Sequence, residues 1–258
     1  GDLINRIFAA AHVSQAVMTN DPFDDGERAK WMAGVASDPR FLPALRLDML
    51  LLHYEEVYPK LQQMGYAVTA ELTEPTLDQI RQFVEDWAQR MGAVYMAVSL
   101  PDSFHYPDDT AATRMIDACI IPVCRKWNLP FAMMIGVRRG VNPGLRMAGD
   151  GVAKADSDAV ANLCSRYPDC KFMLTMLARE NQHEICVLAR KFRNLLVFGC
   201  WWFLNNPSLI DEMTRMRLEM LGTSIIPQHS DARIMDQLVY KWSHSRAVIG
   251  RALKDQYA

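Results

Sequence analysis

An α/β fold built on a parallel sheet is the class that the sequence predicts, on three observations. Short apolar runs alternate with longer amphipathic segments along the whole chain, which is the order of βαβ units. Within the runs apolar residues are continuous, as in strands that are covered on both faces. A length of 258 residues with 50% hydrophobic residues is enough to bury one full core. We therefore expect residues 1–258 to form a single domain.

Seven apolar runs are candidate strands, whereas a closed barrel of parallel strands needs eight. The runs cover residues 13–19, 41–47, 93–100, 130–137, 171–177, 195–200 and 223–228. Two architectures fit this count: an open sheet, or a barrel of which one strand lies outside the sequence. An open sheet would leave unpaired backbone groups on its two outer strands, which proteins usually cover.

The amphipathic segments between the runs carry signals for helix ends. Asn206 suits an N-cap and Pro207 the first helical position, because proline has no N–H to lose there. Gly222 suits the end of that helix, since glycine readily adopts the left-handed backbone that closes many helices. For the long helix earlier in the chain, we expect Thr76 or Glu74 to be the cap.

Charge and cysteine usage narrow the class of protein. The net charge is −2 and no basic block stands out, so neither nucleic acid nor a membrane surface is expected as a partner. No apolar run reaches the roughly 18 residues of a membrane-spanning helix, and the start of the sequence lacks the layout of a signal peptide. The 6 cysteines include no C-x-x-C pair, which predicts reduced, buried thiols in a cytoplasmic protein.

The stretch 222–246 is the expected centre of the chemistry. An apolar run ends there in the polar cluster HSDAR, and an amphipathic helix follows; parallel barrels hold their active sites at such carboxyl ends. Asp231 can bind a divalent metal ion or take a proton from a substrate. Arg233 can neutralise an oxyanion or a carboxylate. The structural alternative is a capped helix start, because Ser230 and Asp231 are both good N-caps.

Arg46 follows another candidate strand and could reach the same face. Its guanidinium lies within an apolar run, where a cation is costly unless it meets an anion. That anion can be a bound substrate, or it can be Asp48 or Asp21 in a structural ion pair. The sequence leaves both roles open.

One histidine and two tryptophans complete the candidate set. Trp201 follows the run at 195–200, and Trp242 lies on the closing helix. Their places predict the wall of a pocket, although core packing is the commoner role of such residues. His183 stands in a polar first helical turn that matches neither H-E-x-x-H nor the paired E-x-x-H motifs of a di-iron site.

The sequence resembles the uronate isomerases, a branch of the amidohydrolase superfamily. The resemblance rests on MTNDPFDD, ALRLD, FAMMIGV, ENQHE, GCWWFLNNP and MLGTSIIPQHSDAR, which follow one another along nearly the whole chain. It implies a TIM (β/α)8 barrel of the metal-dependent hydrolase type. Strands 2–8 would be present in this chain and strand 1 would be missing, so that the chain is expected to be an internal fragment.

The resemblance also implies an activity and roles for individual residues. Uronate isomerases interconvert D-glucuronate with D-fructuronate and D-galacturonate with D-tagaturonate, by proton transfer through an enediol. Asp231 matches the aspartate that binds the metal and moves the proton, and Arg233 the arginine that stabilises the enediolate. Arg46 and Trp242 match substrate-binding residues, and we add Trp201 and His183 to these on their expected positions.

A divalent metal ion, Zn²⁺ in many members of the family, is the implied cofactor. Members carry H-x-H on the first barrel strand, and this chain has no H-x-H. Asp231 is therefore the one metal ligand expected within the chain, and two histidine ligands are expected outside it.

Two further functions stay open beside the isomerase. One is a metal-dependent hydrolase of the same superfamily, in which Asp231 would be the general base for a metal-bound water. The other is a catalytically incomplete fragment that folds or binds sugar acids without turnover. The expected partner is a small-molecule uronic acid, and we expect a homo-oligomer.

Overall fold

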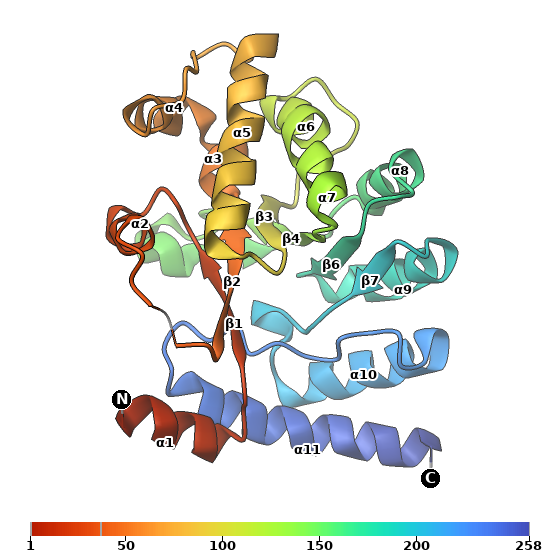
Figure 1. The fold of residues 1–258 in the computed structure, drawn as a ribbon. Coiled ribbons are helices and arrows are strands. Elements are labelled where there is room, and N and C mark those ends of the chain that lie inside the picture. The colour runs from red at the N-terminus through yellow and green to blue at the C-terminus, as the bar shows by residue number, and fades with distance from the viewer. Residues whose placement is uncertain (1, 37, 258) are drawn as a thin grey trace.

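A parallel sheet runs through the centre of the computed structural model, which describes residues 2–36 and 38–257 (Figure 1). Its strands follow in the order β1 (Ala16–Asn20), β2 (Phe41–Arg46), β3 (Met96–Pro101), β4 (Phe131–Arg138), β6 (Phe172–Met176) and β7 (Leu195–Val197). Each neighbouring pair in this order is parallel. The predicted α/β class is confirmed, and the arrangement is consistent with a TIM barrel.

Helices connect the strands and pack against the sheet. They are α1 (Asp2–Ala11), α2 (Asp25–Met32), α3 (Asp48–Leu52), α4 (Tyr54–Gln63), α5 (Glu74–Met91), α6 (Ala111–Met115), α7 (Ile121–Trp127), α8 (Ser157–Arg166), α9 (Gln182–Lys191), α10 (Pro207–Leu221) and α11 (Gln237–Tyr257). A π-helical turn, η1 (Ile116–Ile120), joins α6 to α7. Short 3-10 turns are η2 (Pro143–Gly149), η3 (Arg179–Asn181) and η4 (Trp202–Leu204).

The central strands are buried on both faces, which explains their continuous apolar runs. In β4, Phe131 and Met133 join the large core beneath the helices, whereas Ala132 between them joins a small cluster on the other face. In β6, Phe172 and Met173 divide in the same way. Side chains alternate between faces along a strand, so both faces need apolar residues.

The two ends of the strand order differ from the prediction. β1 pairs only with β2 among the described residues, and Val17 and Met18 are 45% and 43% exposed. The predicted strand at 223–228 is wrong as a strand, because Ile226 makes only an isolated bridge to Phe198. Beyond this bridge the Gln228 side chain, rather than a backbone carbonyl, accepts the Cys200 N–H.

One predicted helix cap is confirmed and another is wrong. Asn206 accepts a hydrogen bond from the Leu209 N–H at the start of α10, and Gly222 follows its last residue. The cap of α5 is Thr73, whose hydroxyl accepts from the Thr76 N–H. The helix therefore begins at Glu74, two residues before Thr76, and Pro75 occupies the early position that its missing N–H favours.

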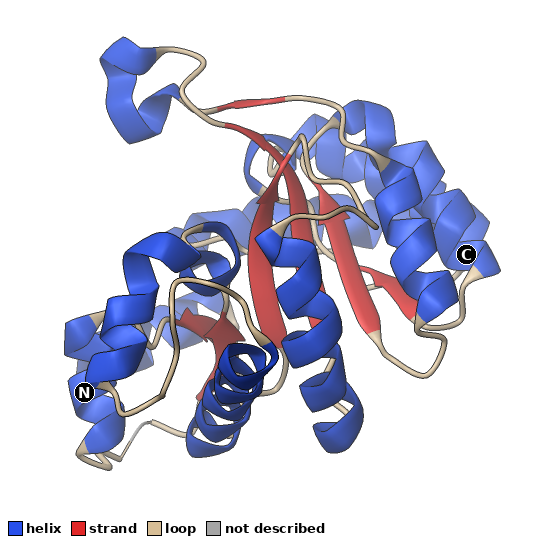
Figure 2. Cartoon of the chain, turned by 90° about the horizontal axis from the view of Figure 1, so that it is seen from above, coloured by secondary structure: helices blue, strands red, loops and turns tan. Residues whose placement is uncertain are grey.

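An antiparallel excursion after β4 was not predicted. β4 runs into η2 and returns as β5 (Gly151–Val152), which pairs with the end of β4. This arm stands off from the body of the molecule at the upper left of Figure 2. It matters for the site because Ala148, within η2, lines the cavity described below.

Helices α1 and α11 lie side by side and bring both ends of the described chain to the bottom of the view (Figure 1). Arg246 of α11 donates to the carbonyls of Ala11 and His12 at the end of α1. This guanidinium satisfies carbonyls that the helix end leaves without partners, so α11 is held where its first turns can border the cavity.

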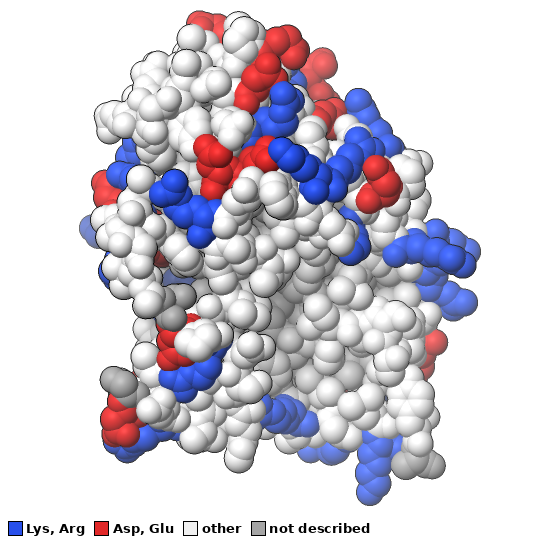
Figure 3. Space-filling model, viewed as in Figure 1, with Lys and Arg blue, Asp and Glu red and all other residues white. Residues whose placement is uncertain are grey.

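The surface of the face seen in Figure 1 is unevenly charged. Figure 3 shows charged side chains over its upper part and along its margins, while the hollow at its centre is largely uncharged. All 6 cysteines are buried free thiols, as predicted. Among the described residues, no helix combines the length and the apolar character needed to cross a membrane.

We expect the buried core, represented by Leu174 of β6, to contribute much more to stability than the arm does. Leu174 is fully buried in the main core, so Leu174→Ala should lower the free energy of unfolding by about 2–5 kcal/mol through lost burial and a cavity. Leu145 on the arm is 57% exposed, and Leu145→Ala should change it by less than about 0.5 kcal/mol. Urea unfolding of both variants measures the contrast, and equal losses would contradict this description of the core.

Candidate active site

A cavity of about 530 Å³ opens where several strands end. Its walls are formed by Ala148, Trp202, Phe203, Asp231, Arg233, Gln237 and Lys241. These residues come from the arm after β4, the segment after β7, the loop after the Ile226 bridge and the start of α11. All of them follow the carboxyl ends of their strands, where parallel barrels carry their active sites.

An aromatic pair forms one wall of the cavity. The rings of Trp202 and Phe203 are stacked, with centroids 4.8 Å apart and planes inclined by 13°. Trp201, which the sequence singled out, lies behind them in a buried cluster with Val137 and Leu177. Trp201 therefore supports the wall, whereas Trp202 and Phe203 present its surface.

Asp231 faces this wall from the opposite loop. Both Asp231 and Trp202 have left-handed backbone, with φ of 48° and 45°, which is uncommon for residues other than glycine. Burial raises the pKa of the Asp231 carboxyl above its ordinary value, and the cations of Lys241 and Arg233 and the Trp202 N–H offset part of this rise. A half-buried carboxylate with a raised pKa is better matched to proton transfer near neutral pH than an exposed one.

Two cations stand beside this carboxylate. The Arg233 guanidinium lies 6.0 Å from the centre of the Trp202 ring, and within the described part of the chain it has no ion-pair partner. The ammonium of Lys241 donates to the Asp231 carbonyl over 2.7 Å. Arg233, Gln237 and Lys241 are spaced by four residues, and the Gln237 side chain accepts the Arg233 N–H. The cavity thus offers positive charge to an anionic ligand.

Side chains from the segment after β7 hold the loop that leads to Asp231. Gln228 Oε1 accepts the N–H groups of Cys200 and His229 over 2.7 and 3.0 Å. The amide of Asn205 donates to the carbonyls of His229 and Ser230 over 3.4 and 2.9 Å. The loop has no regular hydrogen-bond ladder, so these two amides supply partners that its backbone would otherwise lack.

Gly199 allows the two segments to approach this closely. A Cβ atom at Gly199 would lie 1.8 Å from Cδ2 of the His229 ring, and its φ is 67°. Both the space and the backbone conformation therefore require glycine. Burial lowers the pKa of His229 to about 4, so the imidazole packed against Gly199 and Phe198 is neutral.

A fully buried arginine ties the same region to the sheet. Arg217 of α10 donates to the Gly199 carbonyl over 2.7 Å and to Gln182 Oε1 over 2.8 Å. Gln182 in turn donates to the Met176 carbonyl at the end of β6. Arg217 was not predicted, although its position on the buried face of α10, one turn after Met213, is the signal that could have revealed it.

Arg46 forms the ion pair that the sequence left open. Its guanidinium binds Asp48 through two hydrogen bonds of 3.0 Å, and these raise its pKa. Asp48 also accepts the Ser99 N–H of β3. Arg46 does not line the cavity, yet its charge still lowers the pKa of Asp231.

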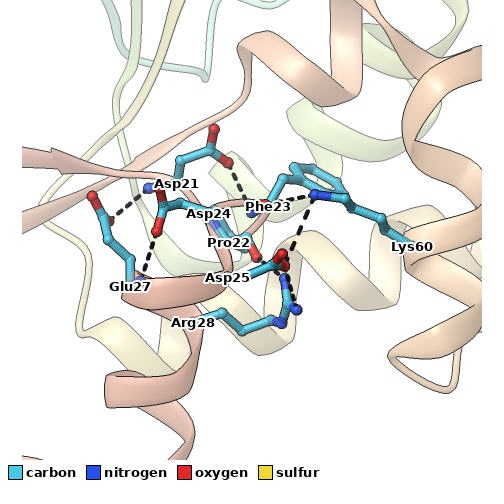
Figure 4. A network of polar contacts seen from close by, with 8 residues as sticks. All are labelled: Asp21, Pro22, Phe23, Asp24, Asp25, Glu27, Arg28 and Lys60. Carbon is cyan, nitrogen blue, oxygen red and sulfur yellow. Dashed lines mark hydrogen bonds and ion pairs between the residues drawn. The ribbon is translucent and has the colours of Figure 1, made fainter.

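The loop after β1 positions Asp21 near Arg46. Figure 4 shows its closed network, in which Asp21 accepts the Phe23 N–H and Asp24 accepts the Glu27 N–H at the start of α2. Glu27 returns to accept the Asp21 N–H. Burial raises the pKa of Asp21, and Arg46 lowers it.

Trp242 and His183, like Arg46 and Trp201, do not line the cavity. Trp242 is half-buried beside α1, in a cluster with Ile7 and Leu238, and Arg246 covers its ring at 5.4 Å. His183 is exposed on the first turn of α9. Their substrate-binding roles stay predictions. Lys241 and Gln237, which do line the cavity, were missed, although their four-residue spacing from Arg233 could have indicated them.

The donors present in the chain do not by themselves form a metal site. No group of three or more His, Cys, Asp or Glu side chains that could hold a metal ion occurs in residues 2–36 and 38–257. Asp231 offers one carboxylate, and its nearest charged neighbours are cations. A tightly bound zinc ion needs at least three protein ligands, so Asp231 could be only one of them.

Comparison with solved structures gives strong similarities. A uronate isomerase from Bacillus halodurans is 54% identical over 99% of this chain and 61% of its own, with a TM-score of 0.96. A uronate isomerase from Thermotoga maritima and a glucuronate isomerase from Caulobacter crescentus share 16% identity, with TM-scores of 0.76 and 0.74. They share the fold over 98% and 97% of this chain and 64% and 60% of theirs.

The chain therefore spans less than two thirds of the length of each of these three structures. No family model matches the sequence, and no curated protein matches it.

Gly199 provides a direct test of the contact between the two loops. Gly199→Ala should lower the free energy of unfolding by about 1–3 kcal/mol more than Gly92→Ala, because the added methyl group overpacks against His229. Gly92 is a matched control, since its φ is 61° and an added Cβ would meet no atom within 4 Å. In Gly92→Ala the free energy of unfolding should fall only by the cost of left-handed backbone in alanine, about 1–2 kcal/mol. Equal losses in urea unfolding would show that the contact is looser than described.

Proposed function

Because the chain fits the uronate isomerase family over the residues that it contains, we propose that it carries part of the active site of an aldose–ketose isomerase of uronic acids. The reaction would convert D-glucuronate to D-fructuronate, and D-galacturonate to D-tagaturonate. The observation that carries the proposal is a cavity that joins a half-buried carboxylate, two cations and an aromatic wall.

In the proposed reaction Asp231 moves the proton. Its carboxylate takes the proton from C2 of the open-chain aldose and returns it to C1. The hydroxyl proton on O2 passes to O1, so that the aldehyde becomes a hydroxyl group and C2 becomes the carbonyl. A raised pKa supports this role, because a base must hold the proton briefly before it releases it. The Trp202 N–H and the Lys241 ammonium on either side of Asp231 would keep the carboxylate oriented during both transfers.

Arg233 would stabilise the negative charge that develops on the substrate oxygens. Its guanidinium has no carboxylate partner within the described residues, so it is available to an oxyanion or to the carboxylate of the sugar acid. The Trp202–Phe203 pair suits the C–H face of a sugar, and a volume of about 530 Å³ lies within the usual range of small-molecule sites.

Asp231 is the one residue of this chain that we propose as a metal ligand. We propose one divalent ion, Zn²⁺ by resemblance, with Asp231 as its ligand from this chain and two histidines contributed from outside it. When bound, the ion would polarise the substrate carbonyl. The described residues of this chain do not complete such a site. In the proposal Asp231 carries the proton transfers.

Location and assembly are further proposals. We propose a cytoplasmic protein, which the 6 free buried thiols support because such thiols suit a reducing compartment. A homo-oligomer also stays a prediction. It can be tested by measuring the molecular mass in solution with light scattering.

Asp231→Asn tests the proton-transfer role. The amide keeps the shape of the side chain and removes the base, so turnover of D-glucuronate should fall by about 10²–10⁴-fold. Asp109→Asn is a matched control, because Asp109 is exposed and lies far along the chain in the loop before α6. Ketose formation is followed by chromatography, with D-galacturonate as the second substrate.

The outcomes of this assay separate the candidate functions. Ketose from the unaltered chain supports the isomerase, whereas a cleavage product from another substrate would support the hydrolase. An unaltered chain that binds the uronates without turnover is the incomplete fragment. An Asp231→Asn variant with near-normal turnover would overturn the assignment of the base.

Arg233→Met tests the binding of the sugar acid without requiring turnover. Loss of a charge-assisted contact of about 1.4 kcal/mol or more should weaken D-glucuronate binding at least about tenfold, measured by calorimetry. Arg138→Met is the control, because the Arg138 side chain is 58% exposed, pairs with Asp102 and does not line the cavity. Equal affinities for both variants would remove Arg233 from the binding site.

A further inference from the structure

The backbone of the loop before and at Asp231 is held by side chains rather than by a ladder. Asn205 binds the carbonyls of His229 and Ser230, and Lys241 binds the carbonyl of Asp231 over 2.7 Å. Three successive carbonyl groups are therefore satisfied by side chains from two other segments. Lys241 makes the last of these contacts, at the residue that carries the chemistry.

Asp231 is also the residue of this loop with left-handed backbone, at φ 48°. Such backbone costs free energy in residues other than glycine, so it persists only where surrounding contacts hold it. A hydrogen bond from an ammonium ion to a carbonyl is of the stronger, charge-assisted kind. The Lys241 contact is thus well placed to select this conformation.

Lys241 lies on a helix that is well packed against the rest of the molecule. Lys241 lies in the second turn of α11 (Gln237–Tyr257), four residues after Gln237, whose side chain accepts the Arg233 N–H. α11 is packed against α1 and α10 and buries Leu238 and Val248. The ammonium therefore reaches the loop from a rigid element.

We propose that Lys241 is a positioning residue, which locks Asp231 in its left-handed backbone by binding its carbonyl oxygen and so holds the Asp231 carboxylate toward Trp202 and the cavity. The catalytic use of that carboxylate rests on the proposed function, whereas the lock itself does not. Lys241 also lines the cavity, so direct binding of the ligand is the competing role that the experiment must separate.

The lock is tested by nuclear magnetic resonance on the whole chain labelled at aspartate with ¹³C and ¹⁵N. The Asp231 signals are identified by their loss in Asp231→Asn. In Lys241→Met the Asp231 Cα and amide shifts should leave the left-handed range. They should stay in it in Lys241→Arg, whose guanidinium can still reach the carbonyl, and in Lys254→Met.

Lys254 is a matched control because it lies exposed in the last turn of the same helix. The other aspartate signals report whether each variant is folded. If Lys241→Met does not fold, Lys241→Leu, which also removes both the charge and the donor, takes its place. Unchanged Asp231 shifts in the folded, uncharged variant would overturn the proposal, whatever the activity of the chain.

Turnover, where it is found, separates positioning from direct binding. Misplacement of the base should lower kcat by about 10²-fold while KM stays within about twofold, and Lys241→Arg should recover most of the rate. A rise in KM with unchanged kcat would mean that Lys241 binds the substrate and would overturn the positioning role. If neither the unaltered chain nor any variant turns over, the chain is the incomplete fragment, and the resonance experiment still decides the lock.

Discussion

The close approach of the segment after β7 to the loop before Asp231 is the contact on which the site depends. Gly199 admits the neutral His229 ring at a distance that no side chain could tolerate. Gln228 and Asn205 then cross-link the two backbones. Without this approach the Trp202 wall and the Asp231 carboxylate would not border one cavity. The segments GCWWFLNNP and HSDAR each supply one side of this contact.

Buried polar side chains next to this contact hold the Gly199 backbone in place through hydrogen bonds. Arg217 is fully buried and binds the Gly199 carbonyl, and its other partner, Gln182, continues to the end of β6. A buried guanidinium without a carboxylate is costly unless its donors are used. Here those bonds bring the ends of β6 and β7 and the helix α10 into one network. The segment that forms the aromatic wall of the cavity is therefore fixed to the sheet by hydrogen bonds.

The sequence predicted the parts of the fold that depend on local pattern. The continuous runs of β4 and β6 and the cap at Asn206 follow from burial and from backbone chemistry within a few residues. The bridge at Ile226 and the role of Lys241 could not be predicted in this way, because each depends on partners distant in the chain. Arg46 shows the same limit. The sequence predicted that its guanidinium would bind an anion, but only the folded structure shows that the anion is Asp48.

A crystal structure of the chain with D-glucuronate bound tests the central claim most directly. The account predicts that the sugar acid occupies the cavity beside Trp202, with Asp231 within hydrogen-bond distance of the C1–C2 unit and Arg233 in contact with a substrate oxygen. A ligand bound elsewhere, or Asp231 and Arg233 turned to different sides of the loop, would contradict it.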